Sequence, residues 1–191
     1  TGGQAAVSAI DPALPYDVMR DFAFISTVTR FPFVLLVAPD SRFATLADAS
    51  DTFDLDVQLA DRTGSFSSGW DGRTLTKKGA GTLVLSEAAA YTGDTIVSEG
   101  TMRTDVADAV ASSGHVSVAK GATLDLNGFD QQIQHLNGAG NIALGGATLD
   151  LRNTDDSVFN GAIGGAGALH KRGAGSLTLG GANVYDGGTV I

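Results

Sequence analysis

The sequence contains no cysteine, which excludes a disulfide framework and any cysteine-ligated metal site. It has only 4 prolines, and its 26 glycines follow no strict Gly-x-y period, which excludes a collagen-like chain. Basic residues are scarce: 12 Lys and Arg against 21 Asp and Glu leave a formal net charge of -9. This balance argues against non-specific binding to nucleic acid or to an anionic membrane surface. The longest apolar run, residues 31–39, is far shorter than the roughly 20 residues of a membrane-spanning helix.

The chain begins at Thr1 without the charged and apolar segments of a signal peptide, and it ends at Ile191 inside what resembles a strand. We therefore expect a fragment of a longer protein. Hydrophobic residues make up 43% of the chain and charged residues 17%, which is enough apolar material for a packed core rather than a disordered chain.

One motif occurs twice, as LTKKGAGTLVL at 75–85 and as LHKRGAGSLTL at 169–179. The same offset continues beyond the motif, because Tyr91 matches Tyr185 and Gly93 matches Gly187. Self-similarity over such a length predicts a repeat architecture.

A second motif, GATLDL, occurs at 121–126 and again at 146–151. Four Leu-x-Leu pairs run through the region; they are Leu83/Leu85, Leu124/Leu126, Leu149/Leu151 and Leu177/Leu179. We interpret the two shorter intervals, from Leu124 to Leu149 and from Leu149 to Leu177, as coil lengths. The first interval, from Leu83 to Leu124, is markedly longer, and we expect it to contain one further coil around 106–118.

Alternation with a period of two places both leucines of each pair on one face of a short strand. Gly-Ala-Gly, Asn-Gly and Gly-Gly steps separate the strands, and no helical period is sustained from 70 to 191. Short strands and glycine turns in repeats of about 20–30 residues predict a solenoid in which each coil buries its leucines against the next. The predicted fold is therefore mainly β, a right-handed parallel β-helix, with an antiparallel sandwich or a propeller as the alternatives.

The repeat resembles a known family. Residues 75–86, followed by Tyr91-Thr-Gly-Asp-Thr and Glu99-Gly-Thr-Met, are similar to the autotransporter-associated β-strand repeat, with Met102 where leucine is usual. The resemblance implies a passenger segment displayed at the bacterial cell surface or secreted through the periplasm. It also implies a C-terminal translocator barrel in the full-length protein, and a host or cell-surface glycan or protein as partner.

Residues 1–50 have a different composition and form an α/β pattern, with all 4 prolines and no glycine after Gly3. The stretches 9–22 and 33–39 resemble part of the solute-binding receptors of tripartite tricarboxylate transporters, whose other strands and second lobe are missing here. We therefore divide the chain into this α/β fragment, a junction at 51–69, and the repeats at 70–191. Residues 1–50 serve either as a cap over the β-helix or as a loosely attached segment.

Parallel β-helices include polysaccharide lyases and hydrolases, whose sites gather two or three carboxylates with Arg or Lys on one outer face. Asp125 and Asp150 occupy equivalent positions of the two GATLDL motifs and would stack if their coils were adjacent, with Arg152 nearby. Such a pair could raise the pKa of one of the two carboxyl groups or hold Ca²⁺. The alternative is that both aspartates lie on a solvated outer face without a chemical role.

Other polar residues give weaker signals. The histidines, His115, His135 and His170, lack metal-binding spacing, and we expect them at surface or turn positions. The pairs Lys77-Lys78 and Lys171-Arg172 lie at equivalent repeat positions. They predict either a small basic stripe that binds an acidic glycan, or charged side chains that only protect a turn or a sheet edge from further pairing. Trp70 is expected to be a core or cap residue, with a sugar-binding platform as the alternative.

These observations predict no catalytic, cofactor-binding or metal-binding residue. The leading hypothesis is a non-enzymatic β-helical passenger segment that acts as a scaffold or in adhesion. The first alternative is a periplasmic solute-binding protein for carboxylate uptake, and the second is a glycan-active β-helix enzyme.

Overall fold

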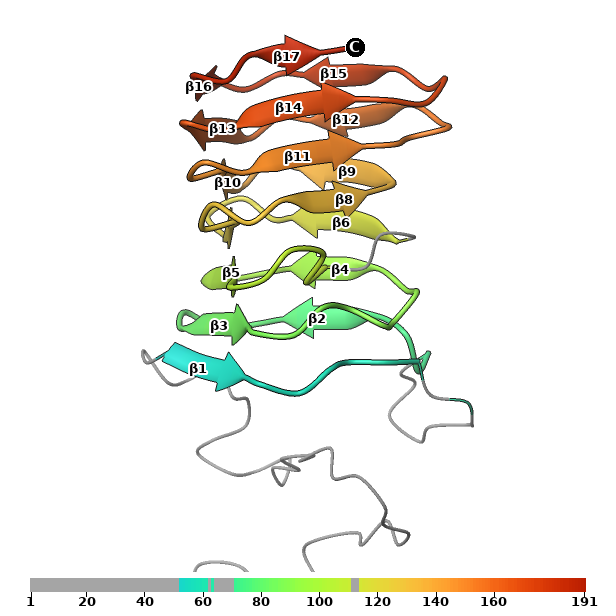
Figure 1. Cartoon of the computed structure of the whole chain (residues 1–191), viewed down its shortest axis with the longest axis vertical. Helices are drawn as coiled ribbons and strands as arrows, with labels where there is room; N and C mark the ends of the chain where they lie inside the picture. The colour runs from blue at the N-terminus through green and yellow to red at the C-terminus, as the bar shows by residue number, and fades with distance from the viewer. Residues whose placement is uncertain (1–51, 62, 64–70, 111–113) are drawn as a thin grey trace, which may run out of the picture. The chain divides into compact units, whose positions relative to one another are not determined.

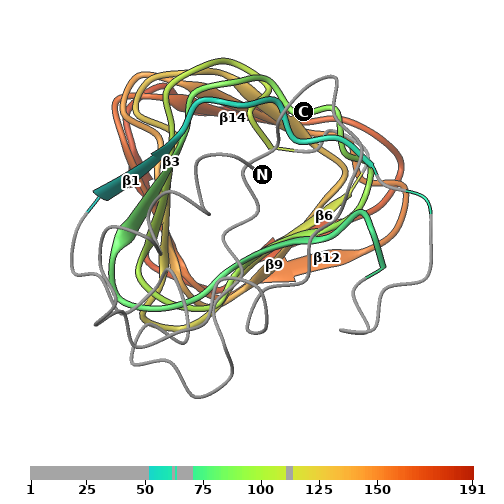
Figure 2. The ribbon, with the colours of Figure 1, turned by 90° about the horizontal axis from the view of Figure 1, so that it is seen from below.

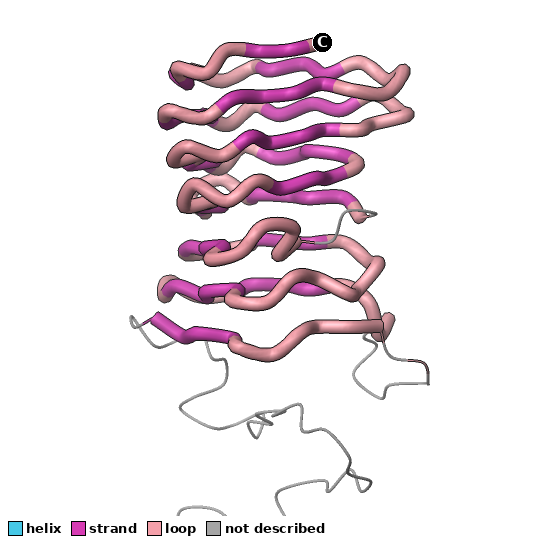
Figure 3. The backbone as a smooth tube through the Cα atoms, in the orientation of Figure 1, coloured by secondary structure: helices cyan, strands magenta, loops and turns pink. Residues whose placement is uncertain are grey.

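The computed structural model describes residues 52–61, 63, 71–110 and 114–191. All regular structure in these residues is β-strand (Figure 3). None of them belongs to a helix long and apolar enough to cross a membrane.

The strands form three sheets in which every pairing is parallel. The seven-stranded sheet contains β1 (Thr52–Leu55), β3 (Thr82–Leu85), β5 (Thr101–Thr104), β7 (Thr123–Asp125), β10 (Asn141–Ala143), β13 (Ala162–Gly165) and β16 (Val184–Tyr185). The six-stranded sheet contains β2 (Leu75–Lys77), β4 (Thr95–Val97), β6 (His115–Val118), β9 (His135–Gly138), β12 (Ser157–Phe159) and β15 (Leu177–Leu179). The four-stranded sheet contains β8 (Gln131–Ile133), β11 (Thr148–Leu151), β14 (Ala168–Lys171) and β17 (Thr189–Val190).

Strands β2 to β6 alternate between the six-stranded and the seven-stranded sheet, and from β6 onward the chain visits the six-stranded, the seven-stranded and the four-stranded sheet in turn before it starts the next coil. Viewed along the stack, the coils enclose a three-sided cross-section (Figure 2). In Figure 1 the front strands such as β11 and β14 run to the right, the rear strands such as β12 run to the left, and the chain climbs. That sense of winding is right-handed, so the predicted right-handed parallel β-helix is confirmed.

Strand register sets the length of one coil. His115 pairs with His135, a difference of 20 in number, whereas Thr101 pairs with Thr123, a difference of 22, and Thr123 pairs with Asn141, a difference of 18, so one coil from β2 onward takes 18 to 22 residues. We had expected the intervals from Leu124 to Leu149 and from Leu149 to Leu177 to be coil lengths. That expectation is wrong, because these leucines lie on three different sheets. Each of those intervals is one coil plus one further side of the triangle.

The longer interval between Leu83 and Leu124 does contain one further coil. Its residue in this position is Met102, which pairs with Leu83 below and with Leu124 above. The coil that runs from Met102 to Leu124 contains the stretch 106–118, where we had expected it.

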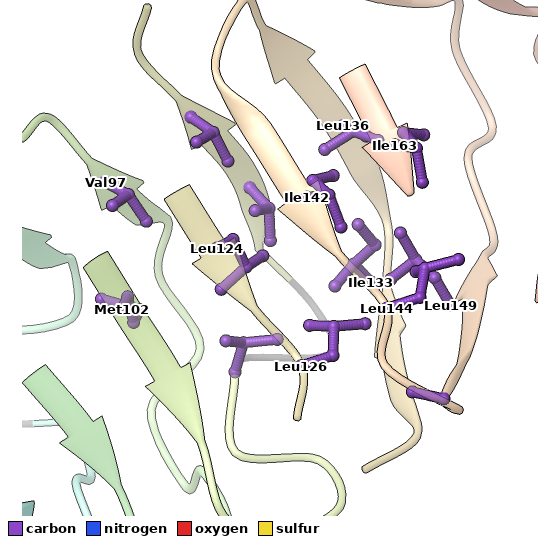
Figure 4. Close-up of a cluster of buried hydrophobic side chains, with 14 of the residues drawn as sticks. Val97, Met102, Leu124, Leu126, Ile133, Leu136, Ile142, Leu144, Leu149 and Ile163 are labelled. Atoms are coloured by element: carbon purple, nitrogen blue, oxygen red, sulfur yellow. The ribbon is translucent and has the colours of Figure 1, made fainter. Parts of the chain in front are cut away.

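Columns of apolar side chains fill the interior, as Figure 4 shows for its central part. One column on the seven-stranded sheet consists of Leu83, Met102, Leu124, Ile142 and Ile163 in consecutive register. The last four are at most 2% exposed. At ~25 cal/mol per Å² of apolar surface, each such side chain contributes about 1.5–3 kcal/mol, so stability accumulates from coil to coil.

Gln131 supports the irregular side of the coil between β5 and β6, where the four-stranded sheet has no strand. It is 1% exposed. Its Oε1 accepts from Val110 N at 3.2 Å, and its Nε2 donates to the carbonyl oxygens of Val106 and Phe129 at 2.9 and 3.1 Å. A buried amide is tolerated here because backbone groups that lack a ladder partner satisfy it.

Candidate functional site on the outer faces of the solenoid

The interior is filled by apolar columns, so charged and polar chemistry lies on the outer faces and at the corners. The arrangement of these groups decides which of the functions predicted from the sequence the molecule can support.

Asp125 and Asp150 do not stack. Asp125 lies in β7 on the seven-stranded sheet, where its register partners are Arg103 and Ala143. Asp150 lies in β11 on the four-stranded sheet and pairs with Gln132 and His170. The two carboxylates face different sides, because the offset between the two GATLDL motifs exceeds one coil by one side of the triangle. The predicted carboxylate pair is therefore wrong.

Asp125 belongs to a polar cluster of its own. Arg103 Nε and Nη2 donate to the two carboxylate oxygens of Asp105, both at 2.9 Å. Asn127 donates from its side chain to Asp105 Oδ1 and from its backbone N to Asp125 Oδ1, also at 2.9 Å. The hydrogen bonds from Arg103 lower the pKa of Asp105, and Asp105 in turn raises the pKa of the guanidinium. The cluster holds the Asp105 carboxylate ionised, which does not suit a general acid.

Asp150 lies between two arginines. Arg152 Nη2 and Nε donate to Asp150 Oδ2 at 3.0 and 3.2 Å, and Arg172 Nε lies 3.3 Å from Asp150 Oδ1. Arg152 was expected nearby, and the structure confirms it. Arg172 was placed with Lys171 in a basic stripe, and its proximity to Asp150 was missed.

His115 and His135 form a contact that the sequence did not reveal. They are register partners in β6 and β9, with ring centroids 4.4 Å apart. His135 Nδ1 lies 3.3 Å from Ser157 Oγ, and its Nε2 lies 3.8 Å from Asp155 Oδ2. His135 is 8% exposed, so the expectation of a surface or turn position is wrong for it. His115 and His135 are one coil apart, a relation that becomes visible only when the coil length is known.

The two lysine pairs do not form a stripe. Lys77 ends β2 on the six-stranded sheet, whereas Lys171 ends β14 on the four-stranded sheet. Each ammonium group instead donates to carbonyl oxygens of its own corner, Lys77 to Gly79 and Lys171 to Gly173 among others. These lysines stabilise turns. Trp70 lies outside the described residues.

Several aspartates hold the backbone of a neighbouring coil. Asp61 Oδ1 accepts from Thr92 N at 2.7 Å, and Asp156 Oδ1 accepts from Ser176 N at 2.9 Å. Hydrogen bonds from Thr92 and Ser176 lower the pKa of Asp61 and Asp156, respectively. Much of the acidic charge is therefore structural, and two further aspartates accept from the backbone in the same way: Asp94 from His115 and Asp130 from Thr148.

A shallow groove of about 560 Å³ lies on the seven-stranded sheet over β7, β10, β13 and β16. Its floor contains small residues such as Ala143 and Gly164, and its margin includes Asp125 and Val184. Asp125 already accepts from Asn127 N, so the groove offers contact area rather than reactive groups. Among the described residues, no group of three or more His, Cys, Asp or Glu is arranged to hold a metal ion.

Comparison with known proteins shows which proteins the chain is similar to. The family model described as passenger-associated-transport-repeat matches residues 75–103 and 169–191. The chain is 42% identical over 125 residues to "Adhesin BmaC autotransporter" from Brucella suis biovar 1 (strain 1330), and 38% identical over 112 residues to "Probable autotransporter YfaL" from Escherichia coli (strain K12). The chain carries autotransporter passenger repeats.

The matches to the two relatives cover 61% and 54% of this chain but only 4% and 9% of the relatives' own lengths. The autotransporter passenger segment thus spans a small part of the proteins it resembles. Neither relative is a tripartite-transporter receptor by name, and residues 1–50 lie outside the described residues. The resemblance of that segment to a solute-binding receptor stays a prediction.

Proposed function

We propose that this passenger segment is a non-enzymatic, surface-displayed adhesion module whose outer faces contact a host or cell-surface partner. The observation that carries the proposal is its 42% identity over 125 residues to a protein named as an adhesin and autotransporter. The solenoid supports it physically, because a stack of coils presents three long, regular faces at fixed spacing. Display at the bacterial surface, or release from it, follows from the same resemblance, as does a C-terminal translocator barrel in the full-length protein.

The distribution of charge supports adhesion better than catalysis. Glycoside hydrolysis uses two carboxylates within about 5–9.5 Å of each other on one side. Asp125 and Asp150 lie on different faces, and each is already engaged, by Asn127 and by two arginines respectively.

The test is a bead-adhesion assay with the full chain. Beads coated with the folded chain should bind epithelial monolayers several-fold better than beads coated with the same chain after heat unfolding. Equal binding by the two bead types would refute a role for the folded faces.

A parallel assay addresses the enzyme alternative. The chain is incubated with a panel of neutral and acidic polysaccharides, and new reducing ends or unsaturated products are measured. We expect none. Cleavage that disappears in Asp125→Ala or Asp150→Ala would replace the adhesion proposal with an enzymatic one.

A further inference from the structure

Arg152 and Arg172 occupy the same place on two successive coils. The register of β11 and β14 pairs Asp150 with His170 and Leu151 with Lys171, so the next residues, Arg152 and Arg172, are neighbours across the coils. Adjacent strands are about 4.8 Å apart, and like charges at that distance repel each other. An anion between them is required to hold them together.

Asp150 supplies that anion from below. Its side chain is 18% exposed, whereas those of Arg152 and Arg172 are 46% and 59% exposed. Asp150 therefore lies beneath two guanidinium groups that reach the surface. Arg172 contacts it through Nε, and within the described residues no further ion pair or hydrogen bond of the Arg172 side chain is seen.

The other arginine–aspartate cluster of the molecule shows what is unusual here. Arg103 meets Asp105 in a two-pronged pair, one cation to one anion, and Asn127 also donates to that carboxylate. On the four-stranded sheet two cations share one anion. One positive charge is left over, on a chain whose net charge is -9.

We propose that Arg152 and Arg172 form a binding site for a single carboxylate, that of an acidic sugar at the end of a glycan. Guanidinium groups present paired N–H donors that match the two oxygens of a carboxylate, and such charge-assisted hydrogen bonds are roughly twice as strong as neutral ones. Asp150 is the positioning residue, since it holds the two guanidinium groups side by side.

The surrounding charge selects an isolated anionic group and disfavours a polyanion. Asp155 and Asp156 follow Arg152 at the same corner, between β11 and β12, where Asp155 lies 3.8 Å from His135 Nε2 and Asp156 accepts from Ser176. Their carboxylates and the net charge of the chain repel an extended polyanion such as nucleic acid, or an anionic membrane. A glycan with one terminal acid carries a single negative charge, so it meets less of that repulsion than an extended polyanion does.

This inference rests on the proposed adhesive function for its biological context, but its test does not. The full chain is titrated with sialyllactose, with lactose as its neutral counterpart and with heparin as a polyanion, and binding is followed by saturation-transfer NMR. We expect sialyllactose to bind at least about tenfold more tightly than lactose, as one charge-assisted contact implies. We also expect heparin to bind no better than sialyllactose.

Arg152→Gln and Arg172→Gln should each weaken sialyllactose binding about tenfold, whereas the matched control Arg103→Gln on the seven-stranded sheet should leave it unchanged. Circular dichroism of each variant checks that the β-helix is intact. Equal binding of lactose, stronger binding of heparin, equal effects of Arg103→Gln and Arg172→Gln, or no binding of any probe would each overturn the site. If the unaltered chain does not bind sialyllactose while beads coated with it still adhere, the site fails and the adhesive function stands; if the unaltered chain binds sialyllactose but its beads do not adhere, the adhesive function fails and the site stands.

Discussion

The two copies of the repeat, at 75–103 and 169–191, have nearly the same local structure in different surroundings. In both copies the lysine ammonium binds the carbonyl oxygens of its own corner, and a glycine with positive φ follows, Gly79 at 78° and Gly173 at 85°. In both copies a tyrosine and a threonine hydroxyl also meet, at 2.7 Å in the first and 2.6 Å in the second.

The copies differ in where they lie. The first begins on the six-stranded sheet at β2, and the second begins on the four-stranded sheet at β14. Lys77 is 7% exposed, and the next coil supplies Glu99 O as a third acceptor, whereas Lys171 has two carbonyl acceptors, both at its own corner. Burial lowers the pKa of Lys77, and the nearby Glu99 opposes this shift. The motif therefore specifies the corner, and the following coil decides how deeply that corner is buried.

Truncation of the matched leucine to alanine should give the largest difference in stability loss between the two copies. Leu85 is 3% exposed, and its counterpart Leu179 is only partly buried. Leu85→Ala should lower the free energy of unfolding by about 2–4 kcal/mol, because it removes buried surface and leaves a cavity. Leu179→Ala should cost less than about half of that. Urea unfolding followed by circular dichroism measures both, and equal losses would contradict the difference in burial.

Removal of the lysine ammonium should have the next largest effect. Lys77→Met leaves three corner carbonyls without their donor and should cost about 2–3 kcal/mol, since unpaired buried polar groups are expensive. Lys171→Met acts at a more exposed corner and should cost under about 1 kcal/mol. The same unfolding assay compares them. A larger loss for Lys171→Met would show that burial by the next coil is unimportant.

The hydroxyl pair gives a smaller contrast. Tyr91 is 5% exposed, and Tyr91→Phe removes the hydrogen bond to Thr95, which should cost about 1 kcal/mol. Tyr185→Phe, in the more exposed second copy, should cost a few tenths of a kcal/mol. Thermal unfolding of the two variants beside Thr95→Val and Thr189→Val tests whether each loss belongs to the hydrogen bond.

Acid should affect both copies alike, and only slightly. Asp61 binds Thr92 N in the first copy, and Asp156 binds Ser176 N in the second. Both pKa values are lowered from 3.8, so this stabilisation is complete above that value and is lost as the pH falls through the folded pKa values. Unfolding midpoints between pH 5 and pH 2 should fall less in Asp61→Asn and Asp156→Asn than in the wild type. A flat wild-type profile would show that these contacts are not coupled to stability.

The period of two and the glycine steps were sufficient to predict a parallel β-helix, because alternating leucines have few other ways to be buried. They were insufficient to predict the coil length. All three sides are short strands that end at similar corners, so a repeated motif can occupy any side. GATLDL occupies the seven-stranded sheet once and the four-stranded sheet once, and the expected pairing of Asp125 with Asp150 failed for that reason.

The sequence also did not predict the contacts between side chains on successive coils. His115 with His135, and Arg152 with Arg172, are separated by one full coil, a spacing that matches neither motif offset. A single glutamine, Gln131, completes the irregular coil by binding three backbone groups from two coils, and no local pattern signals such a role.

By itself, the sequence determined the strands, the corners and which side chains of each strand face the interior, since these depend on residues that are close along the chain. It also determined the resemblance to autotransporter passengers, through motifs that form corners. Only the tertiary structure decided which side of the triangle each motif occupies and which charges therefore meet. The physical reason is that strand register depends on the full length of each coil, and one additional side moves every outward-facing group to another face.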